Sequence, residues 1–283
     1  MNDHSPVFDP PSGEYNASYP ENIAVGSFIA SVTASDMDSG PQGEVYYSIV
    51  GGNTGNKFSV NTSSGEVRTI ASLDRETTAT FTLVIRASDG AIHGKARFSN
   101  GTLVVHVTDI NDNAPAFADA PSVAVSVSET KSVGEVGATV LATDADSGIN
   151  SELRYTIISG NDGYFTINST TGDLIVNRSL DMEQIPLPDL EHHLVINARD
   201  LGEVVSFNTS VHVNITIAAI NEFTPALQHA DNFNFTLAEN TSPGDGVVLV
   251  DINATDADYG VHGHVTYNLV SGMKIYLEYV LFF

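Results

Sequence analysis

The 283-residue chain contains no cysteine, so neither disulfide bonds nor thiol chemistry can contribute to its stability or activity. Basic residues are scarce, since 11 lysines and arginines stand against 35 aspartates and glutamates and leave a formal net charge of -24. This charge argues against a nucleic acid as the partner. A solvated acidic surface would also explain it, but here the acids recur in clusters at matching positions, which favours binding sites.

A long apolar run is also missing. The longest apolar stretch, residues 275–283, is interrupted by Glu278 and is shorter than the ~18 residues needed to cross a bilayer. Residues 1–6 lack the basic start and apolar stretch of a signal peptide. We therefore expect a segment of a longer secreted or membrane protein, or ends that come from an incomplete gene model.

Asn-x-Ser/Thr sequons are abundant, although roughly four would be expected by chance from such a composition. The excess indicates a glycosylated extracellular surface, with accidental accumulation in Ser/Thr-rich strands as the alternative. Asn214 lies on the polar side of the alternating segment 211–217, where a sugar could project into solvent. The ten asparagines are Asn16, Asn61, Asn100, Asn168, Asn177, Asn208, Asn214, Asn234, Asn240 and Asn253.

Acidic markers recur in the same order with a period near 110 residues, which matches whole small domains in series. We expect two complete units, residues 1–113 and 114–223, and the N-terminal half of a third, residues 224–283, of which 273–283 matches nothing in the repeat. The markers are Glu21, Glu129 and Glu239; Asp36-Met37-Asp38, Asp144-Ala145-Asp146 and Asp256-Ala257-Asp258; Leu73 to Glu76 and Leu180 to Glu183; and Arg86 to Asp89 and Asn197 to Asp200.

The apolar pattern within each unit has period two, in short runs such as 28–32, 45–49, 81–87 and 103–107. Amphipathic helices of ten or more residues are not indicated. The predicted fold class is therefore all-β, with tandem seven-stranded Greek-key (Ig-like) sandwiches. Residues 62–66 and 170–173 are predicted to be hairpin turns, and Pro115 and Pro225 to begin the next unit rigidly.

The candidate ligands are oxygens, which calcium prefers, and zinc is a poor fit because cysteine and a His-x-x-x-His pair are both missing. The nine histidines are scattered. We expect them at the surface, His192 and His193 in an acidic connecting segment and His262 and His264 in a turn.

Asp-Arg-Glu, Asp-Ile-Asn-Asp-Asn-Ala-Pro, Asp-Ala-Asp and Ala-Arg-Asp, with a glutamate near each unit's start, resemble tandem extracellular cadherin repeats over residues 2–272, as in a longer protocadherin or Fat-like cadherin. In that family three calcium ions sit between consecutive repeats. The resemblance implies that the first two are held by Glu21, Asp74, Glu76, Asp109, Asp112 and the carbonyl of Ile110, with Asp146 bridging to the second. The third would take Asn111, the carbonyl of Asn113, Asp144, Asp146, a carbonyl near Asn150, and Asp200.

The second junction departs from this pattern. Ala219 removes a carboxylate, Glu222 is longer than the bridging aspartate, and Phe223 replaces a residue that coordinates through its carbonyl. The ligands expected there are Glu129, Asp181, Glu183, Asn221, Glu222, Asp256 and Asp258, and weaker or incomplete calcium binding follows. Asn2, Asp36, Asp38 and Asp89 would form half of a further site that awaits a preceding repeat.

The resemblance implies calcium-dependent cell–cell adhesion, with other cadherin ectodomains as partners and homophilic contact as the usual mode. It also implies a location on the extracellular side of the plasma membrane, to which a transmembrane span of the parent chain would attach this segment. Tryptophan is absent, so strand exchange through an N-terminal tryptophan is unavailable. A calcium-binding spacer or carbohydrate-binding module without adhesion is the alternative. A glycosidase using Asp74 and Glu76 is disfavoured, because these acids repeat in both units and no Gly-x-Ser-x-Gly motif is present.

Overall fold

The computed structural model describes residues 2–91, 96–118, 121–160, 162–185, 191–228 and 252–268. Strands and short 3-10 turns make up the regular structure of these ranges, and they include no helix that is long and apolar enough to span a membrane. The chain divides into two compact units. Residues 1–116, 142–154 and 198–209 form one, and residues 117–141, 155–197 and 210–283 form the other.

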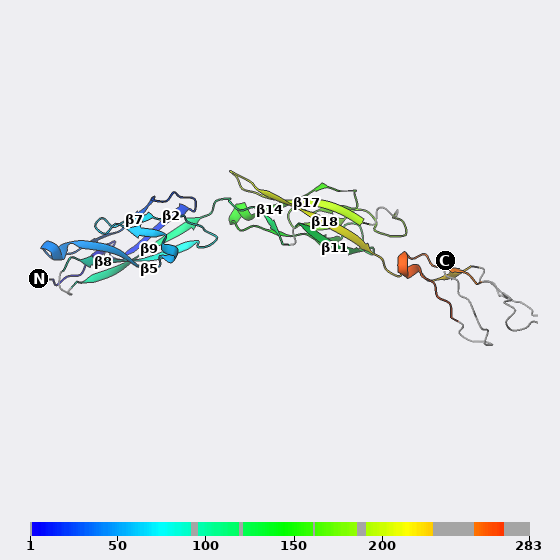
Figure 1. The fold of residues 1–283 in the computed structure, drawn as a ribbon, viewed down its shortest axis with the longest axis horizontal. Coiled ribbons are helices and arrows are strands. Elements are labelled where there is room, and N and C mark those ends of the chain that lie inside the picture. The colour runs from blue at the N-terminus through cyan, green and yellow to red at the C-terminus, as the bar shows by residue number, and fades with distance from the viewer. Residues whose placement is uncertain are drawn as a thin grey trace, which may run out of the picture. The chain divides into compact units, whose positions relative to one another are not determined.

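The first repeat is a two-layer β-sandwich (Figure 1). Its larger sheet has the strand order β2-β9-β8-β5, and its smaller sheets are β3-β7-β6 and β1-β4. The first long strand, β2, runs parallel to the last, β9, which is the crossover of a Greek-key sandwich. Its strands are β1 (Val7–Asp9), β2 (Glu14–Pro20), β3 (Phe28–Ser31), β4 (Thr33–Ser35), β5 (Val45–Gly51), β6 (Phe58–Val60), β7 (Glu66–Thr69), β8 (Thr80–Asp89) and β9 (Phe98–Thr108), with 3-10 turns at Gly40–Gly43 and Thr54–Asn56.

The core of this repeat follows from alternation along the strands. Every second residue of β8 is buried, from Phe81 to Asp89, because successive side chains of a strand point to opposite faces. Phe58 and Phe81 meet edge to face with ring centroids 5.0 Å apart. β1 with β2 and β3 with β4 are segments of two interrupted strands, so the predicted seven-stranded all-β sandwich is confirmed.

The second repeat has the same strand orders, β11-β18-β17-β14, β12-β16-β15 and β10-β13. Here too the first long strand, β11, is parallel to the last, β18. Its strands are β10 (Ala116–Phe117), β11 (Ser122–Ser128), β12 (Val136–Thr139), β13 (Ala142–Thr143), β14 (Leu153–Ser159), β15 (Phe165–Ile167), β16 (Asp173–Val176), β17 (Glu191–Asp200) and β18 (Asn208–Ala218), with a 3-10 turn at Gly148–Ser151.

The expected surface position of His192 is wrong. This residue lies in β17 and is only 1% exposed, with its ring 5.3 Å from Phe165 between centroids. It alternates in phase with Leu194 and Ile196, which are also buried, and takes the core place that Phe81 has in the first repeat. Its Nδ1 contacts the carboxylate of Asp162, which lets a polar ring enter the core.

The two predicted hairpin turns are confirmed by their glycines. Gly65 has φ +70° and Gly172 has φ +72°, and a Cβ at either would lie 2.1 Å or 2.3 Å from a backbone oxygen, that of Val32 or Val140. Only glycine satisfies both the left-handed conformation and this close approach. The structural equivalence supports the repeat period seen in the sequence.

The third segment is described only at 224–228 and 252–268. It contains the paired strands β19 (Ala226–Leu227) and β20 (Ala254–Thr255) and a 3-10 turn at Gly260–Gly263. As predicted, β10 and β19 begin directly after Pro115 and Pro225. Glu239, the sequons at Asn234 and Asn240, and the tail 273–283 lie outside the described residues.

Candidate metal centres

A buried glutamate at the start of each complete repeat ties two loops together. Glu21 is 4% exposed and accepts hydrogen bonds from the backbone N–H groups of Arg75, at 2.8 Å, and Ile110, at 3.1 Å. Glu129 accepts the same pair of bonds from Met182, at 3.0 Å, and Ile220. Both carboxylates therefore fix the Leu-Asp-x-Glu loop against the segment that leaves the repeat.

The first junction gathers carboxylates in two overlapping groups. Glu21, Asp74 and Glu76 each place an oxygen within 4.8 Å of the others, and so do Glu76, Asp109 and Asp146. Glu76 belongs to both groups. Three carboxylates at this spacing match the oxygen-rich, irregular coordination that calcium prefers.

The Asp74 carboxylate is held on one side by Thr77. The backbone N–H of Thr77 donates at 3.1 Å and its hydroxyl at 2.6 Å, and these bonds lower the pKa of Asp74. The side chain is therefore ionised and oriented at neutral pH.

A guanidinium lies among these acids. Arg75 forms ion pairs with Asp109 and Glu76, and donates a 2.7 Å hydrogen bond to the carbonyl of Ala145. Its side chain is 16% exposed. At the matching place of the second repeat stands Met182, which is buried and carries no charge. Sequence reasoning assigned no role to this difference.

Hydrogen bonds join the linker, residues 109–113, to the loop after β13. Asp109 of the linker accepts donors from that loop, and Asp146 of the loop accepts donors from the linker. Asp109 accepts the N–H of Ser147 at 3.0 Å and the side-chain amide of Asn150 at 2.8 Å. Asp146 accepts the backbone N–H of Asn113 at 3.3 Å and its side-chain amide at 2.8 Å. A carbonyl near Asn150 was expected to bind the metal, and the contact that the structure records here is made by the Asn150 side chain.

The predicted ligands Asn111, Asp200 and Asp144 are also hydrogen-bonded. The side-chain amide of Asn111 donates to Asp200 at 3.0 Å and to the carbonyl of Val205 at 2.7 Å. Asp144 accepts the N–H of Asp146 at 3.0 Å. These bonds turn the Asn111 amide so that its oxygen points away from Asp200.

Two buried oxygens of this group indicate whether a cation would fit here. Asn111 Oδ1 and Asp144 Oδ2 are buried and, within the described part of the chain, have no hydrogen-bond partner. Buried polar atoms without partners are costly, and both atoms here can only accept. A divalent cation supplies what they lack, so the residues fit the calcium that the resemblance implies.

The pKa values of the acids reflect their crowding. Burial raises the pKa of Asp112, and the charges of Glu21, Asp146, Asp74 and Asp109 raise it further. Burial and the neighbouring charges of Asp146 and Asp200 likewise raise the pKa of Asp144. Like charges in a confined site disfavour ionisation, and a cation reverses that preference.

Asp109 and Asp200 show the opposite direction. Burial opposes ionisation at each, but hydrogen bonds outweigh it and lower the pKa, from Asn150 and Ser147 at Asp109 and from Phe207 and Gly202 at Asp200. The junction therefore contains carboxylates held charged beside carboxylates that resist charge, which is an arrangement suited to a metal ion.

The second junction retains a smaller group, in which Glu129, Glu183 and Glu222 place oxygens within 4.8 Å of one another. Glu183 accepts the N–H of Tyr259 at 2.9 Å, while its Oε2 is buried and, among the residues described, unpartnered. Burial and the charges of Glu129 and Glu183 raise the pKa of Glu222.

Two other predicted ligands of this junction, Glu222 and Asp256, are hydrogen-bonded to Asp258. Asp258 accepts the N–H groups of Glu222 and Phe223 at 3.0 and 3.1 Å, and its own N–H donates to Asp256 at 3.0 Å. Asp181 accepts the side-chain amide of Gln184, and Asn221 is exposed. Ala219 carries no carboxylate, so the interactions that Asp109 makes in the first junction have no counterpart here.

The N-terminal residues repeat the contacts of the first junction. The side-chain amide of Asn2 donates to the buried Asp89 at 2.9 Å, as Asn111 does to Asp200, and Asp36 accepts the N–H of Asp38 at 2.9 Å, as Asp144 does from Asp146. The residues of the predicted half-site are thus hydrogen-bonded in two pairs within the first repeat, Asn2 with Asp89 and Asp36 with Asp38.

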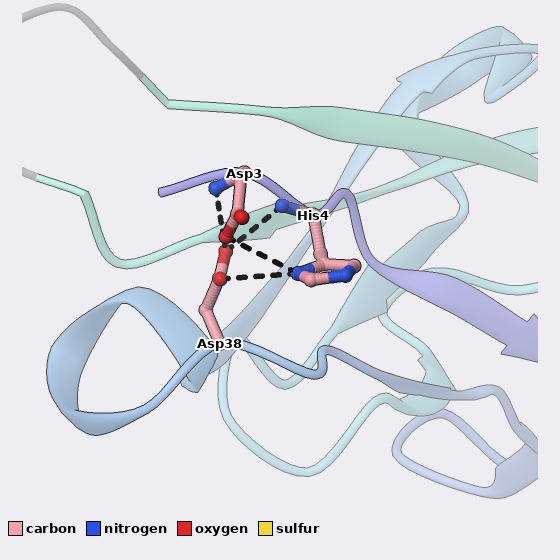
Figure 2. A group of neighbouring side chains, drawn as sticks. All are labelled: Asp3, His4 and Asp38. Carbon is pink, nitrogen blue, oxygen red and sulfur yellow. Dashed lines mark hydrogen bonds and ion pairs between the residues drawn. The ribbon is translucent and has the colours of Figure 1, made fainter. Parts of the chain in front are cut away.

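One side chain of this region was missed. His4 occupies the position of Asn113, and its ring Nδ1 lies 3.2 Å from Asp38 Oδ1 and 3.3 Å from Asp3 Oδ1 (Figure 2). The hydrogen bond to Asp38 raises the pKa of His4. Burial opposes ionisation of Asp38, but hydrogen bonds from the backbone and ring of His4 outweigh it and lower its pKa to about 2. The sequence signal was the histidine at a position otherwise held by Asn113 and Phe223.

Comparison with known proteins agrees with these features. The profile of the cadherin domain matches residues 15–108 and 123–218. "Protocadherin Fat 4" of Mus musculus is 37% identical over 270 residues, which cover 95% of this chain and 5% of the relative. "Fat-like cadherin-related tumor suppressor homolog" of Drosophila melanogaster is 35% identical over 277 residues, covering 97% of this chain and 6% of the relative.

Solved structures give the same assignment. Mouse cadherin-23 EC22-24 has a TM-score of 0.61 and 30% identity, and the match covers 92% of this chain and 80% of that one. Protocadherin gamma B2 extracellular cadherin domains 3-6 have a TM-score of 0.67 and 27% identity, covering 93% and 62%. The chain spans a small part of the curated relatives it matches. The chain belongs to the cadherin family, and its two complete repeats are cadherin domains.

Proposed function

We propose that the chain is a calcium-rigidified segment of a cell-adhesion ectodomain, with repeats at 1–113 and 114–223 and the beginning of a third at 224–283. The observation that carries this proposal is the pair of buried acceptors Asn111 Oδ1 and Asp144 Oδ2, which lack partners among the described residues. They belong to a junction with eight predicted carboxylate ligands, Asp144 among them, whose charge three calcium ions would nearly cancel.

The ligands of the first junction divide into those contributed by the first repeat and the linker, and those of the second repeat. The second repeat would contribute Asp144, Asp146 and Asp200. The first repeat and the linker would contribute Glu21, Asp74, Glu76, Asp109 and Asp112, together with Asn111 and the carbonyls of Ile110 and Asn113. Without metal, like charges a few ångströms apart repel by about 1 kcal/mol per pair even in a water-like dielectric. Calcium would therefore convert a flexible joint into a stiff one.

The second junction would bind calcium more weakly, through Glu129, Asp181, Glu183, Glu222, Asp256 and Asp258 with Asn221. The Asn2, Asp36, Asp38 and Asp89 group would complete a calcium site only with residues of a preceding repeat. Extracellular calcium modules bind at roughly 0.1 to 1 mM. At ~1 mM calcium, a site of ~0.1 mM affinity stabilises the folded state by about 1.4 kcal/mol.

Adhesion follows from the family, and the partner we propose is another cadherin ectodomain, with homophilic contact as the first choice. The partner choice is supported by the solved cis-dimer of protocadherin gammaB7 EC3-6, in which two related ectodomain segments pair. The location we propose is the extracellular side of the plasma membrane, through a longer parent chain.

The test uses the full chain in calcium and in chelator. Calcium should raise the melting temperature and protect the segment 109–113 from proteolysis, and Asn111→Leu should reduce both effects while Glu14→Gln, on an exposed strand position, should not. An equal calcium response in wild type and Asn111→Leu contradicts the site. Coated beads should aggregate only with calcium; calcium-dependent stiffening without aggregation would identify a spacer instead.

A further inference from the structure

We propose that Asp3, His4 and Asp38 form a binding site for zinc, or for another borderline transition-metal dication, that shares Asp38 with the calcium half-site of Asn2, Asp36, Asp38 and Asp89 but differs from it by a nitrogen ligand. One imidazole nitrogen and two carboxylate oxygens provide the ligands, and their atoms all lie within 4.8 Å of one another. The inference does not depend on calcium binding at residues 109–146.

The spacing of the three ligands suits a tetrahedral ion. Nδ1 of His4 is 3.2 Å from Asp38 Oδ1 and 3.3 Å from Asp3 Oδ1. With zinc–ligand bonds of about 2.0–2.1 Å, the edge of a coordination tetrahedron is about 3.3–3.4 Å. The two distances from the imidazole nitrogen therefore match zinc, and the two carboxylate oxygens lie within 4.8 Å of each other.

The Asp38 carboxylate is already oriented for such a role. Its Oδ2 accepts the backbone N–H groups of Asp3, at 3.2 Å, and His4, at 3.1 Å, while Oδ1 faces the imidazole (Figure 2). Outer hydrogen bonds of this kind fix a ligand and leave its other oxygen for the metal. The Asp38 side chain is 3% exposed, so its position is set by packing.

The other two ligands face solvent. The side chains of His4 and Asp3 are 48% and 58% exposed, which leaves a path for the ion and room for water as a fourth ligand. Three protein ligands with a water are a common zinc environment.

The imidazole decides the choice of metal. Calcium takes oxygen ligands almost exclusively, whereas zinc accepts imidazole and carboxylate together. The corresponding residues of the two later junctions are Asn113 and Phe223, neither of which offers a nitrogen ligand. This nitrogen donor thus distinguishes the N-terminal group from the junctions that share its aspartates.

The experiment titrates zinc into the full chain by calorimetry at 2 mM calcium, and compares wild type with His4→Asn, which installs the residue found at position 113. His264 directly follows the 3-10 turn Gly260–Gly263 and lies outside this group, so His264→Asn serves as the matched control for zinc at scattered histidines. Cobalt(II) absorption in the visible range reports whether the coordination is tetrahedral.

We expect His4→Asn to weaken the tightest zinc site at least tenfold and to abolish the tetrahedral cobalt bands, with His264→Asn unchanged. A smaller loss in His4→Asn, or the same loss in His264→Asn, overturns the proposal. The calcium-induced rise in melting temperature should be equal in His4→Asn and wild type, which also shows that the variant folds. If that rise is lost, Asp3→Asn replaces it as the test, with the same tenfold criterion.

Discussion

The side-chain amide of Asn111 donates a 3.0 Å hydrogen bond to Asp200, and this bond fixes the opposite end of the amide as a buried oxygen that no described residue satisfies. A polar contact between the linker and the second repeat thus prepares an acceptor for a cation. The same relationship places Asn2 beside Asp89.

Asp144→Asn should lower calcium affinity about tenfold, because one charged ligand is lost. In chelator the same change should raise the melting temperature by roughly 2–5 °C, since burial and neighbouring carboxylates raise the pKa of Asp144 and its charged form opposes folding without metal. Scanning calorimetry in both conditions checks both signs. Glu14→Gln should change neither, and a stabilised calcium form of Asp144→Asn would contradict the assignment.

Exchanging a single residue between the junctions should exchange part of their calcium affinity. Ala219→Asp restores the missing carboxylate and should strengthen binding at the second junction several-fold, while Asp109→Ala should weaken the first by a larger factor, because Asp109 is already oriented by Ser147 and Asn150. Titration calorimetry of the two variants and wild type provides the comparison. Unchanged calcium stoichiometry and affinity in both variants would count against the ligand sets.

Arg75→Met copies Met182 into the first junction. Removing the guanidinium leaves Asp109 and Glu76 without their ion-pair partner, so the metal-free state should lose about 1 kcal/mol and calcium should bind about fivefold more tightly. The melting temperature in chelator and the calcium dissociation constant are the two measurements. Weaker calcium binding in this variant would show that Arg75 supports the loaded site rather than opposing it.

His192→Phe should stabilise the second repeat by about 1 kcal/mol, because the buried Nε2 of His192 has no partner in the described ranges and a phenylalanine fits beside Phe165 as Phe81 does beside Phe58. The reciprocal variant, Phe81→His, should destabilise the first repeat, because the matching loop, Gly52-Asn53-Thr54-Gly55, contains no carboxylate to receive the ring. Urea unfolding at saturating calcium measures both, and a destabilised His192→Phe would mean that the Asp162 contact outweighs the unpaired nitrogen.

Much of the architecture could be predicted, because a half-buried strand shows alternating apolar and polar residues in the sequence. The alternation at 81–87 and 103–107 became β8 and β9, and the turn glycines Gly65 and Gly172 adopted the positive φ that their hairpins require. The same alternation placed His192 in phase with Leu194 and Ile196, so its burial was readable but was overlooked in favour of the acidic residues around it.

By itself, the sequence determined the class of fold, the length of the repeat and which oxygen-bearing side chains can serve as ligands, because these depend on spacing along one chain. Only the tertiary structure decided that Arg75 pairs with Asp109, that Asn111 turns its amide toward Asp200, and that His4 meets Asp38. Such contacts join loops 34 to 89 residues apart. The packing of the strands determines which loops come into contact, and the residue spacing within a single loop does not reveal this.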